Sequence, residues 1–456
     1  MRRLALVSTL LLAAAAVSAA SAASAGPAGF GFGKPFLVDP SRAGGEPGIF
    51  QITTGKHAGE YLYASHAGTT QLWRGGAQNM ADYLGPYRNQ TYIWRSGNAR
   101  TWRFVDFHGT GTHGTATGFS DPDFAQDDAG NVYETEIDLA NVAVSSSTDG
   151  GRTWTGQPWA QMGDRPWLAA EGNGTVYLAL DLTPSECNAE TIYKSTDRGL
   201  VFPTHSCAQA PWGKGGEIDG SWKIVMDPVT HTLYEPAVVH DANGNTVGVG
   251  VVRSNDHGAT WSGALVAKVK NLASAPSVGT DQAGNVYVVW NPSKDANGTI
   301  GGSLAFASSK NRGKTWSRPT TIASLATGAP GAMFWPWAAG GSAGHLAVAW
   351  YQSNKVTNVD QHGSVISVYA AQILDATAAK PHVDVVNATG VVHRGIVCQS
   401  GTTCVATGQD RRLGDYLTCV VDMSGRLLIA YANTTVDPKS PVARPALVIQ
   451  NSGPRV

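Results

Sequence analysis

Short runs of alternating apolar and polar residues, each followed by a Gly-containing turn and an aromatic residue, recur along most of the chain. In three copies a proline is followed eleven residues later by a tyrosine, at Pro122–Tyr133, Pro166–Tyr177 and Pro276–Tyr287. Asn and Gly in the turns supply the positive φ that a tight hairpin needs, so each copy predicts two antiparallel strands. Looser copies lie at 46–63, 219–236, 335–350 and 415–431.

A second pattern, Ser-x-Asp-x-Gly-x-Thr-Trp, follows several of these strand pairs. It occurs at 147–154 and 254–261, with Asn in place of Asp at 309–316, in degenerate form at 195–202 and one residue short at 96–102. The Asp or Asn side chain accepts hydrogen bonds from the amides of its own turn, and the Trp packs into the core. We therefore expect structural roles for Asp149, Asp197, Asp256 and Asn311.

These octamers match the Asp box, or BNR repeat, and residues 33–456 resemble the sialidase superfamily of β-propellers. In that family the box joins the outer strands of a four-stranded blade, away from the active site. The resemblance implies an all-β fold, a six- or seven-bladed β-propeller in one domain. Seven strand-pair copies favour seven blades, although the family usually has six. The irregular segments are an insertion between 63 and 93 and a link at 381–411, and 35–38 is expected to close the ring against 446–450.

Composition narrows the class of protein further. Of the 456 residues, 54 are Gly and only 15% are charged, and the formal net charge is −1. The apolar content of 42% is too high for a disordered chain. The net charge is close to zero, so the protein has no positive electrostatic field that would attract a nucleic acid. Two or three domains would be usual for this length unless a repeat closes into one ring.

The N-terminus and the cysteines predict an exported protein. Residues 1–25 have two arginines, an apolar run and a small-residue site, Ala23-Ser24-Ala25, which indicates a secretory signal peptide; a retained membrane anchor is the alternative. We expect a secreted monomer that does not associate with the membrane after cleavage. Export permits disulfides, and loop-like spacing favours Cys187–Cys207 and Cys398–Cys404, with Cys419 a buried free thiol.

Candidate chemistry gathers where the chain enters the innermost strand of each blade. In a propeller these entrances converge at one end of the central channel, and here they concentrate acids, arginines and Trp. Trp stacks on sugar faces, Arg grips carboxylates, and close carboxylates supply acid and base. The plainer alternative is that the acids cap turns and that Arg165 pairs with Asp164. The candidates for substrate binding are Glu46, Asp164, Arg165, Asp219, Trp222, Trp335, Arg412 and Asp415.

The resemblance assigns catalytic roles to a further group. Sialidases use three arginines for the substrate carboxylate, a Tyr nucleophile assisted by Glu, and an Asp acid/base. Carried onto this chain, these roles fall on Tyr416 as nucleophile and Glu217 as its partner, with Asp121 or Asp123 as the acid. The family's first arginine lies in a Phe-Arg-Ile-Pro motif, but here Glu46 occupies that register before Pro47, and neither Arg42 nor Arg88 is in register.

The leading functional hypothesis is a glycoside hydrolase of the exo-α-sialidase type that acts on an acidic or otherwise polar glycan. A non-catalytic propeller that binds a glycan or a protein, and a polysaccharide lyase, remain open as alternatives. No cofactor and no metal ion is expected. The two histidines of the loop 108–113 could bind a metal, but a Gly-rich surface segment is the preferred interpretation.

Overall fold

The computed structural model describes residues 29–66, 73–77, 79, 91–105, 120–138, 141–181, 187, 190–208, 217–219 and 222–456. The predicted signal peptide, Arg88 and the loop 108–113 lie outside these residues. In the described part of the chain, no helix combines the length and apolar character that a membrane crossing requires.

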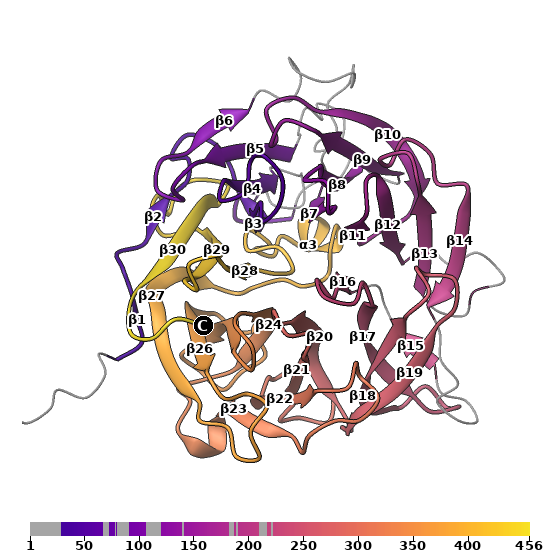
Figure 1. Ribbon diagram of the computed structural model, residues 1–456. Coiled ribbons are helices and arrows are strands. Elements are labelled where there is room, and N and C mark those ends of the chain that lie inside the picture. The colour runs from indigo at the N-terminus through magenta and orange to yellow at the C-terminus, as the bar shows by residue number, and fades with distance from the viewer. Residues whose placement is uncertain are drawn as a thin grey trace, which may run out of the picture.

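Seven antiparallel sheets are arranged around a ring, and they follow one another in chain order (Figure 1). Seven rather than six blades confirms the preferred form of the predicted β-propeller. Blade 1 comprises β3 (Gly45–Gln51), β4 (Tyr61–His66), β5 (Thr91–Ser96) and β6 (Arg103–Val105). Blade 2 comprises β7 (Ser120–Gln126), β8 (Val132–Asp138), β9 (Asn141–Ser147) and β10 (Thr155–Met162). Blade 3 comprises β11 (Trp167–Glu171), β12 (Thr175–Leu180), β13 (Glu190–Ser195) and β14 (Thr204–Ala208).

The remaining blades follow the same order from the innermost strand outward. Blade 4 comprises β15 (Glu217–Asp219), β16 (Val225–Met226), β17 (Leu233–His240), β18 (Thr246–Ser254) and β19 (Ser262–Lys268), and blade 5 comprises β20 (Leu272–Thr280), β21 (Val286–Pro292), β22 (Ser303–Ser309) and β23 (Thr320–Ser324). Blade 6 comprises β24 (Met333–Gly340), β25 (Leu346–Ser353), β26 (Ser364–Ile373) and β27 (Asp384–Gly395). Blade 7 contains β28 (Thr418–Val421), β29 (Leu427–Asn433) and β30 (Arg444–Ser452). The two short helices among the described residues are η2 (Leu325–Thr327) and α3 (Thr403–Thr407).

Two N-terminal strands complete blade 7 and close the ring. β1 (Gly31–Phe32) and β2 (Phe36–Leu37) both pair with β30, and Phe36 lies opposite Leu447. This confirms the predicted closure of 35–38 against 446–450, with β1 starting two residues before the expected boundary at 33. Because both ends of the chain share one sheet, the outer edge of β30 is covered.

The Asp-box side chains close their own hairpins between the third and fourth strands of a blade. Asp149 Oδ1 accepts hydrogen bonds from the amides of Arg152 and Thr153, both at 2.9 Å, and Ser147 Oγ accepts from the amide of Gly151 at 2.8 Å. Trp154 then lies fully buried between blades 1 and 2. The same acceptor geometry recurs at Asp197, Asp256 and Asn311.

Both predicted disulfides, Cys187–Cys207 and Cys398–Cys404, are present, and Cys419 is a buried free thiol. One prediction about the segment 381–411 needs correction. It is not a plain link, because residues 384–395 form β27, the outermost strand of blade 6. The alternating pattern of this strand is weak, because its pairing with β26 shifts register twice and most of its residues are exposed or half-buried.

Candidate functional site

Four residues that precede a proline share an unusual backbone conformation at the entrances to the innermost strands. Glu46, Asp121, Arg165 and Trp335 have φ of 45°, 55°, 51° and 52°, in the left-handed region that L-residues rarely adopt. A following proline pushes its neighbour toward extended backbone, so each of these four positions is strained. Strain of this kind persists only where the surrounding structure enforces it, and it clusters at functional sites.

In three of these entrances the strained residue lies in a β-bulge. On β7, for example, Ser120 pairs with Ile137 and Asp123 pairs with Thr135, so one extra residue is accommodated between them. β3 and β24 carry the same irregularity around Glu46 and Trp335. A bulge redirects a side chain out of the regular alternation, and here it re-aims the residue before each proline.

The entrances surround a cavity of about 210 Å³, which we call the mouth cavity. Its floor is aromatic: the ring of Trp167 packs against Tyr416 and Trp337 at centroid distances of 5.3 and 5.8 Å. Apolar faces with a few converging polar groups are typical of a site for a small ligand. The lining residues are Asp121, Arg165, Trp167, Trp222, Lys223, Ser274, Ala275, Pro276, Ser277, Trp335, Pro336, Trp337, Gln399, Asp415 and Tyr416.

Blade 4 contributes to the cavity through a break in its innermost strand. β15 and β16 both pair with β17, and Trp222 and Lys223 occupy the gap between them. The guanidinium of Arg165 lies 5.0 Å from the centre of the Trp222 ring, a cation–π contact. Lys223 Nζ donates to Asp123 Oδ2 at 2.5 Å and to the carbonyl oxygen of Leu168 at 2.8 Å.

Behind the cavity wall, the carboxyl group of Glu46 lies buried beside Asp121. Glu46 is fully buried, and its Oε2 accepts the backbone amide of Asp121 at 3.3 Å and lies 2.7 Å from His66 Nε2. Burial and the nearby carboxylates of Glu46 and Asp164 raise the pKa of Asp121 well above its usual range. Asp121 lines the cavity, and its surroundings favour the protonated form of its carboxyl group.

A second carboxylate on the cavity wall has the opposite environment. Asp415 receives two hydrogen bonds from Arg411, at 2.8 and 2.6 Å, in a bidentate ion pair. Arg411 also lies 3.6 Å from Glu46 Oε1, and its side chain is almost completely buried. The side chain of Asp415 keeps about a third of its surface exposed, so it is accessible to a ligand while it is paired with the arginine.

Not all predicted site residues meet at the cavity. Asp121, Arg165, Trp222, Trp335, Asp415 and Tyr416 line it, and Asp164 is exposed beside Arg165. Glu46 lies behind the wall, and Asp123 is engaged by Lys223 on the side of the central channel. Arg412 is directed elsewhere, since it pairs with Asp410 at 2.7 Å and lies over Trp73. Glu217 and Asp219 belong to β15, but the structure does not describe their side chains.

Lys223 and Gln399 are cavity residues that the sequence analysis did not identify. Lys223 directly follows Trp222, but nothing in the sequence shows that the strand breaks there. Gln399 follows Cys398 in a segment interpreted as a link, and its place became visible only with the loop that the disulfide closes. Within the described residues, no group of three or more His, Cys, Asp and Glu side chains is arranged to hold a metal ion.

Tyr416 has a geometry that disfavours the phenolate form. Its hydroxyl donates to the carbonyl oxygen of Pro122 at 3.2 Å. Burial and the nearby carboxylates of Asp121 and Glu46 raise its pKa well above the usual range. The phenol ring of Tyr416 instead forms part of the aromatic floor, where it packs against Trp167 and Trp337.

The architecture defines the class of protein: a seven-bladed β-propeller with hairpins closed by Asp or Asn side chains and an aromatic, acid-lined cavity at one end of its ring. No protein-family model matches the sequence, and no curated protein matches it.

Among solved structures, the chain is similar to a Trypanosoma rangeli sialidase in complex with the inhibitor DANA, at 13% identity and a TM-score of 0.43, covering 76% of this chain and 56% of the sialidase. The chain thus spans little more than half of that protein. It is also similar to the intramolecular trans-sialidase from Ruminococcus gnavus, at 12% identity and a TM-score of 0.40, with 90% and 96% covered. An ulvan lyase, titled as a new family of polysaccharide lyase, has 12% identity and a TM-score of 0.48, with 93% and 94% covered.

Proposed function

We propose that this protein is a secreted glycoside hydrolase that binds a polar glycan in the mouth cavity. The observation that carries the proposal is the pair of carboxyl groups on its wall: Asp121 is buried against Glu46, and Asp415 is held by Arg411. A buried carboxyl group with a raised pKa beside a second carboxyl group that is ion-paired with an arginine is an arrangement that can divide acid and base roles. The two disulfides support an oxidising compartment.

The aromatic floor supports a carbohydrate as the ligand. Trp167, Trp337 and Tyr416 present broad apolar ring surfaces, and Arg165 and Trp222 form a polar side wall. A sugar ring has an apolar face of C–H groups and a rim of hydroxyls, so it matches both kinds of surface at once. Acidic or neutral polar glycans fit this lining equally.

In the proposed reaction Asp121 gives its proton to the glycosidic oxygen as the bond to the anomeric carbon breaks. The Asp415 carboxylate takes the anionic role, facing the positive charge that develops at that carbon. A water molecule supplies the hydroxyl of the released sugar, and its remaining proton returns the site to its starting state. In this proposal Tyr416 contributes its ring to the aromatic floor and is not the nucleophile that the resemblance implied. Arg412 takes no part in the reaction.

The test compares Asp121→Asn with wild type on aryl glycosides of graded leaving-group acidity. Loss of a general acid costs about 10²- to 10⁴-fold in kcat when the leaving group needs a proton. We expect that loss with alkyl and phenyl glycosides, and near-normal rates with dinitrophenyl glycosides, which leave without protonation. The matched control is Asp241→Asn, in an exposed turn of blade 4, which should leave activity unchanged.

Four outcomes would contradict the proposal. Equal loss of activity on all leaving groups would indicate that Asp121 is only structural. Loss of activity in Tyr416→Phe together with retention in Asp121→Asn would restore Tyr416 as the nucleophile. An ultraviolet-absorbing unsaturated product would indicate a lyase, and binding on a glycan array without turnover of any substrate would indicate a binding protein.

A further inference from the structure

His66 is a buried residue next to the mouth cavity that has no part in the reaction proposed above. It is the last residue of β4 in blade 1, it is fully buried, and its Nε2 lies 2.7 Å from Glu46 Oε2. The backbone amide of Asp121 donates to the same oxygen at 3.3 Å. Glu46 therefore contacts both the imidazole and the acid of the cavity wall.

The carboxyl groups of Glu46 and Asp121 are also hydrogen-bonded to each other. An ionised carboxylate can only accept a hydrogen bond, so this contact requires a proton on one of the two groups. Two negative charges at such close range would in addition repel each other. We call the pair the carboxyl dyad. Tyr416 does not belong to it, because its hydroxyl donates to the carbonyl oxygen of Pro122.

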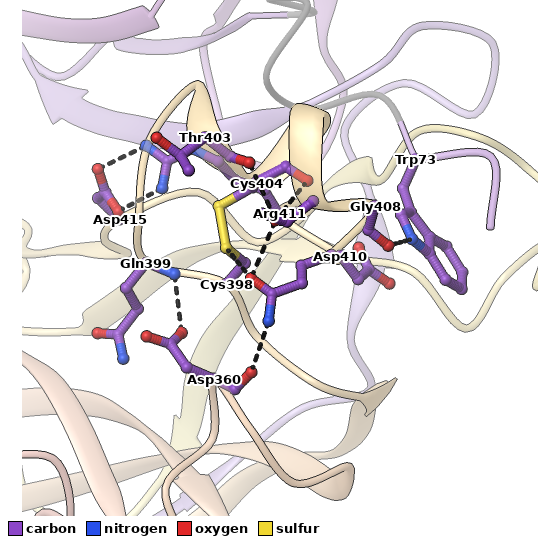
Figure 2. The surroundings of a disulfide bond; sticks show 12 residues. Trp73, Asp360, Cys398, Gln399, Thr403, Cys404, Gly408, Asp410, Arg411 and Asp415 are labelled. Atoms are coloured by element: carbon purple, nitrogen blue, oxygen red, sulfur yellow. Dashed lines mark hydrogen bonds and ion pairs between the residues drawn. A yellow bond between two sulfur atoms is a disulfide. The ribbon is translucent and has the colours of Figure 1, made fainter. Parts of the chain in front are cut away.

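The hydrogen-bond donors of this cluster gather around Glu46. Besides His66 and the Asp121 amide, the guanidinium of Arg411 lies 3.6 Å from Glu46 Oε1 while it holds Asp415 in the bidentate pair (Figure 2). Within the part of the chain that the structure describes, no amide and no basic side chain donates to the carboxyl oxygens of Asp121. The negative charge of the dyad is thus stabilised on Glu46, and its proton is left on Asp121.

The other charged groups of the cluster act in the same direction. Burial and three neighbouring carboxylates raise the pKa of Asp121, namely those of Glu46, Asp164 and Asp415. Burial raises the pKa of Glu46 as well, but there Arg411 and the hydrogen bonds from Asp121 oppose the effect. Of the two partners, Asp121 is therefore the one that keeps the proton to higher pH.

We infer that His66 is a positioning residue for the proposed reaction: its Nε2–H donates to Glu46 and so keeps the proton of the carboxyl dyad on Asp121. A nitrogen lone pair would be repelled by an anionic oxygen at 2.7 Å, so this ring nitrogen carries the hydrogen. The inference rests on the proposed function, because it takes Asp121 to be the general acid. The proton of Asp121 passes to the glycosidic oxygen and is replaced from the attacking water, so His66 itself neither gains nor loses one.

The test compares two variants of His66 with wild type on phenyl and dinitrophenyl glycosides. His66→Leu removes the donor, whereas the side-chain amide of His66→Gln keeps an N–H at a similar reach. His393→Leu is the matched control, because it also removes a buried imidazole. That imidazole lies in blade 6, contacts Thr434 Oγ1 and the carbonyl oxygen of Ile396, and does not line the cavity. Thermal melting confirms that each variant is folded.

We expect His66→Leu to lower kcat on phenyl glycosides about tenfold, the size of one hydrogen bond to a charged group, and to leave dinitrophenyl glycosides nearly unaffected. Without the donor the Glu46 anion is less stable, so the dyad holds its proton to higher pH. The alkaline limb of the kcat profile should therefore move to higher pH, the opposite of the shift expected when the Glu46 carboxylate is removed. His66→Gln and His393→Leu should keep the wild-type rates and limb.

A second measurement locates the proton without any substrate. In infrared spectra of protein with isotope-labelled aspartate carboxyl groups, a protonated-carboxyl band that shifts with the label and disappears in Asp121→Asn belongs to Asp121. We expect this band in wild type and in His66→Gln. It should weaken in His66→Leu, because part of the proton population moves to the unlabelled Glu46.

The outcomes separate the two proposals. The role of His66 is overturned, while the hydrolase proposal stands, if folded His66→Leu behaves as His393→Leu does, if its alkaline limb moves to lower pH, or if its Asp121 band keeps the wild-type intensity. If wild type hydrolyses no glycoside but the band is present and weakens in His66→Leu, the hydrolase proposal fails and the placement of the proton by His66 stands. If wild type shows no Asp121 band, the role of His66 and the acid role of Asp121 fail together.

Discussion

Single residues at the entrances show how one backbone conformation is reused for different chemistry. Glu46, Asp121, Arg165 and Trp335 share nearly the same φ and the same following proline. The repeat therefore keeps the same backbone conformation at this position of each blade, while the side chain varies between carboxyl, guanidinium and indole. Because each position is strained, the packing around it must be rigid enough to hold it.

The prediction at the residue scale concerns the pH dependence of activity in the Glu46→Gln variant. Asp121 acts only when protonated, so activity should be present below its pKa and disappear as the pH rises through it. Burial and the Glu46 carboxylate raise that pKa, and removing the carboxylate should lower it. We expect the alkaline limb of the kcat profile to move to lower pH in Glu46→Gln, measured on a phenyl glycoside. An unmoved limb in a folded variant would show that Glu46 does not act on Asp121.

At the scale of elements, the segment between β27 and β28 supplies much of the site. Gln399, Arg411, Asp415 and Tyr416 all come from it, and the Cys398–Cys404 disulfide and α3 give it a fixed shape. The disulfide spans a sequence separation of 6 residues, so its effect on the unfolded chain is modest. Its principal effect is local: it determines where Gln399 begins.

This leads to a contrast between the two disulfides. Cys398→Ser/Cys404→Ser should cost about 2 kcal/mol of stability and weaken sugar binding in the mouth cavity, because the loop that carries Gln399 loses its fixed shape. Cys187→Ser/Cys207→Ser, which opens a longer loop in blade 3, should cost about 3 kcal/mol and leave binding unchanged. Denaturant unfolding and calorimetry measure the two effects separately. Parallel losses of stability and affinity in both variants would refute the local role.

At the scale of the whole molecule, stability depends on the closure of blade 7 by the N-terminus. Phe30 is buried in the core of blades 6 and 7, and Phe36 packs against the core shared with blade 1. Without β1 and β2, the edge of β30 would be open to solvent and to other chains.

A chain that begins at Asp39 should consequently lose at least about 3 kcal/mol of stability, the cost of removing one buried phenylalanine, and should aggregate. A chain that begins at Gly29 retains both strands and serves as the control, with an unchanged melting temperature. Thermal melting and size-exclusion chromatography provide the measurements. A stable, monomeric short chain would show that the ring does not need this closure.

Most of the fold could be predicted from the sequence because it is repeated locally. The Pro-to-Tyr spacing and the Asp boxes each specify a hairpin from residues close in the chain, and seven copies leave few arrangements other than a ring. β27 was missed because its alternation is weak and it carries no Asp box.

The site was predictable only in part, because a register position does not reveal depth. Asp121 and Arg165 line the cavity as expected. Glu46, which occupies the equivalent position in blade 1, is fully buried. Adjacent arginines diverge as well: Arg411 meets Asp415, whereas Arg412 turns to Asp410. The strand break that admits Lys223 and the two hydrogen bonds that Ser274 accepts depend on contacts between residues far apart in the sequence.

The pairing of Gly31 with Ser452 also bears on how the protein is made. β1 has to wait for β30, because this partner strand is synthesised after all the other described strands. Until then the blades can form one by one, but the circle stays open. A chain that ends before Ser452 therefore cannot complete the closure, however many of its other blades have formed.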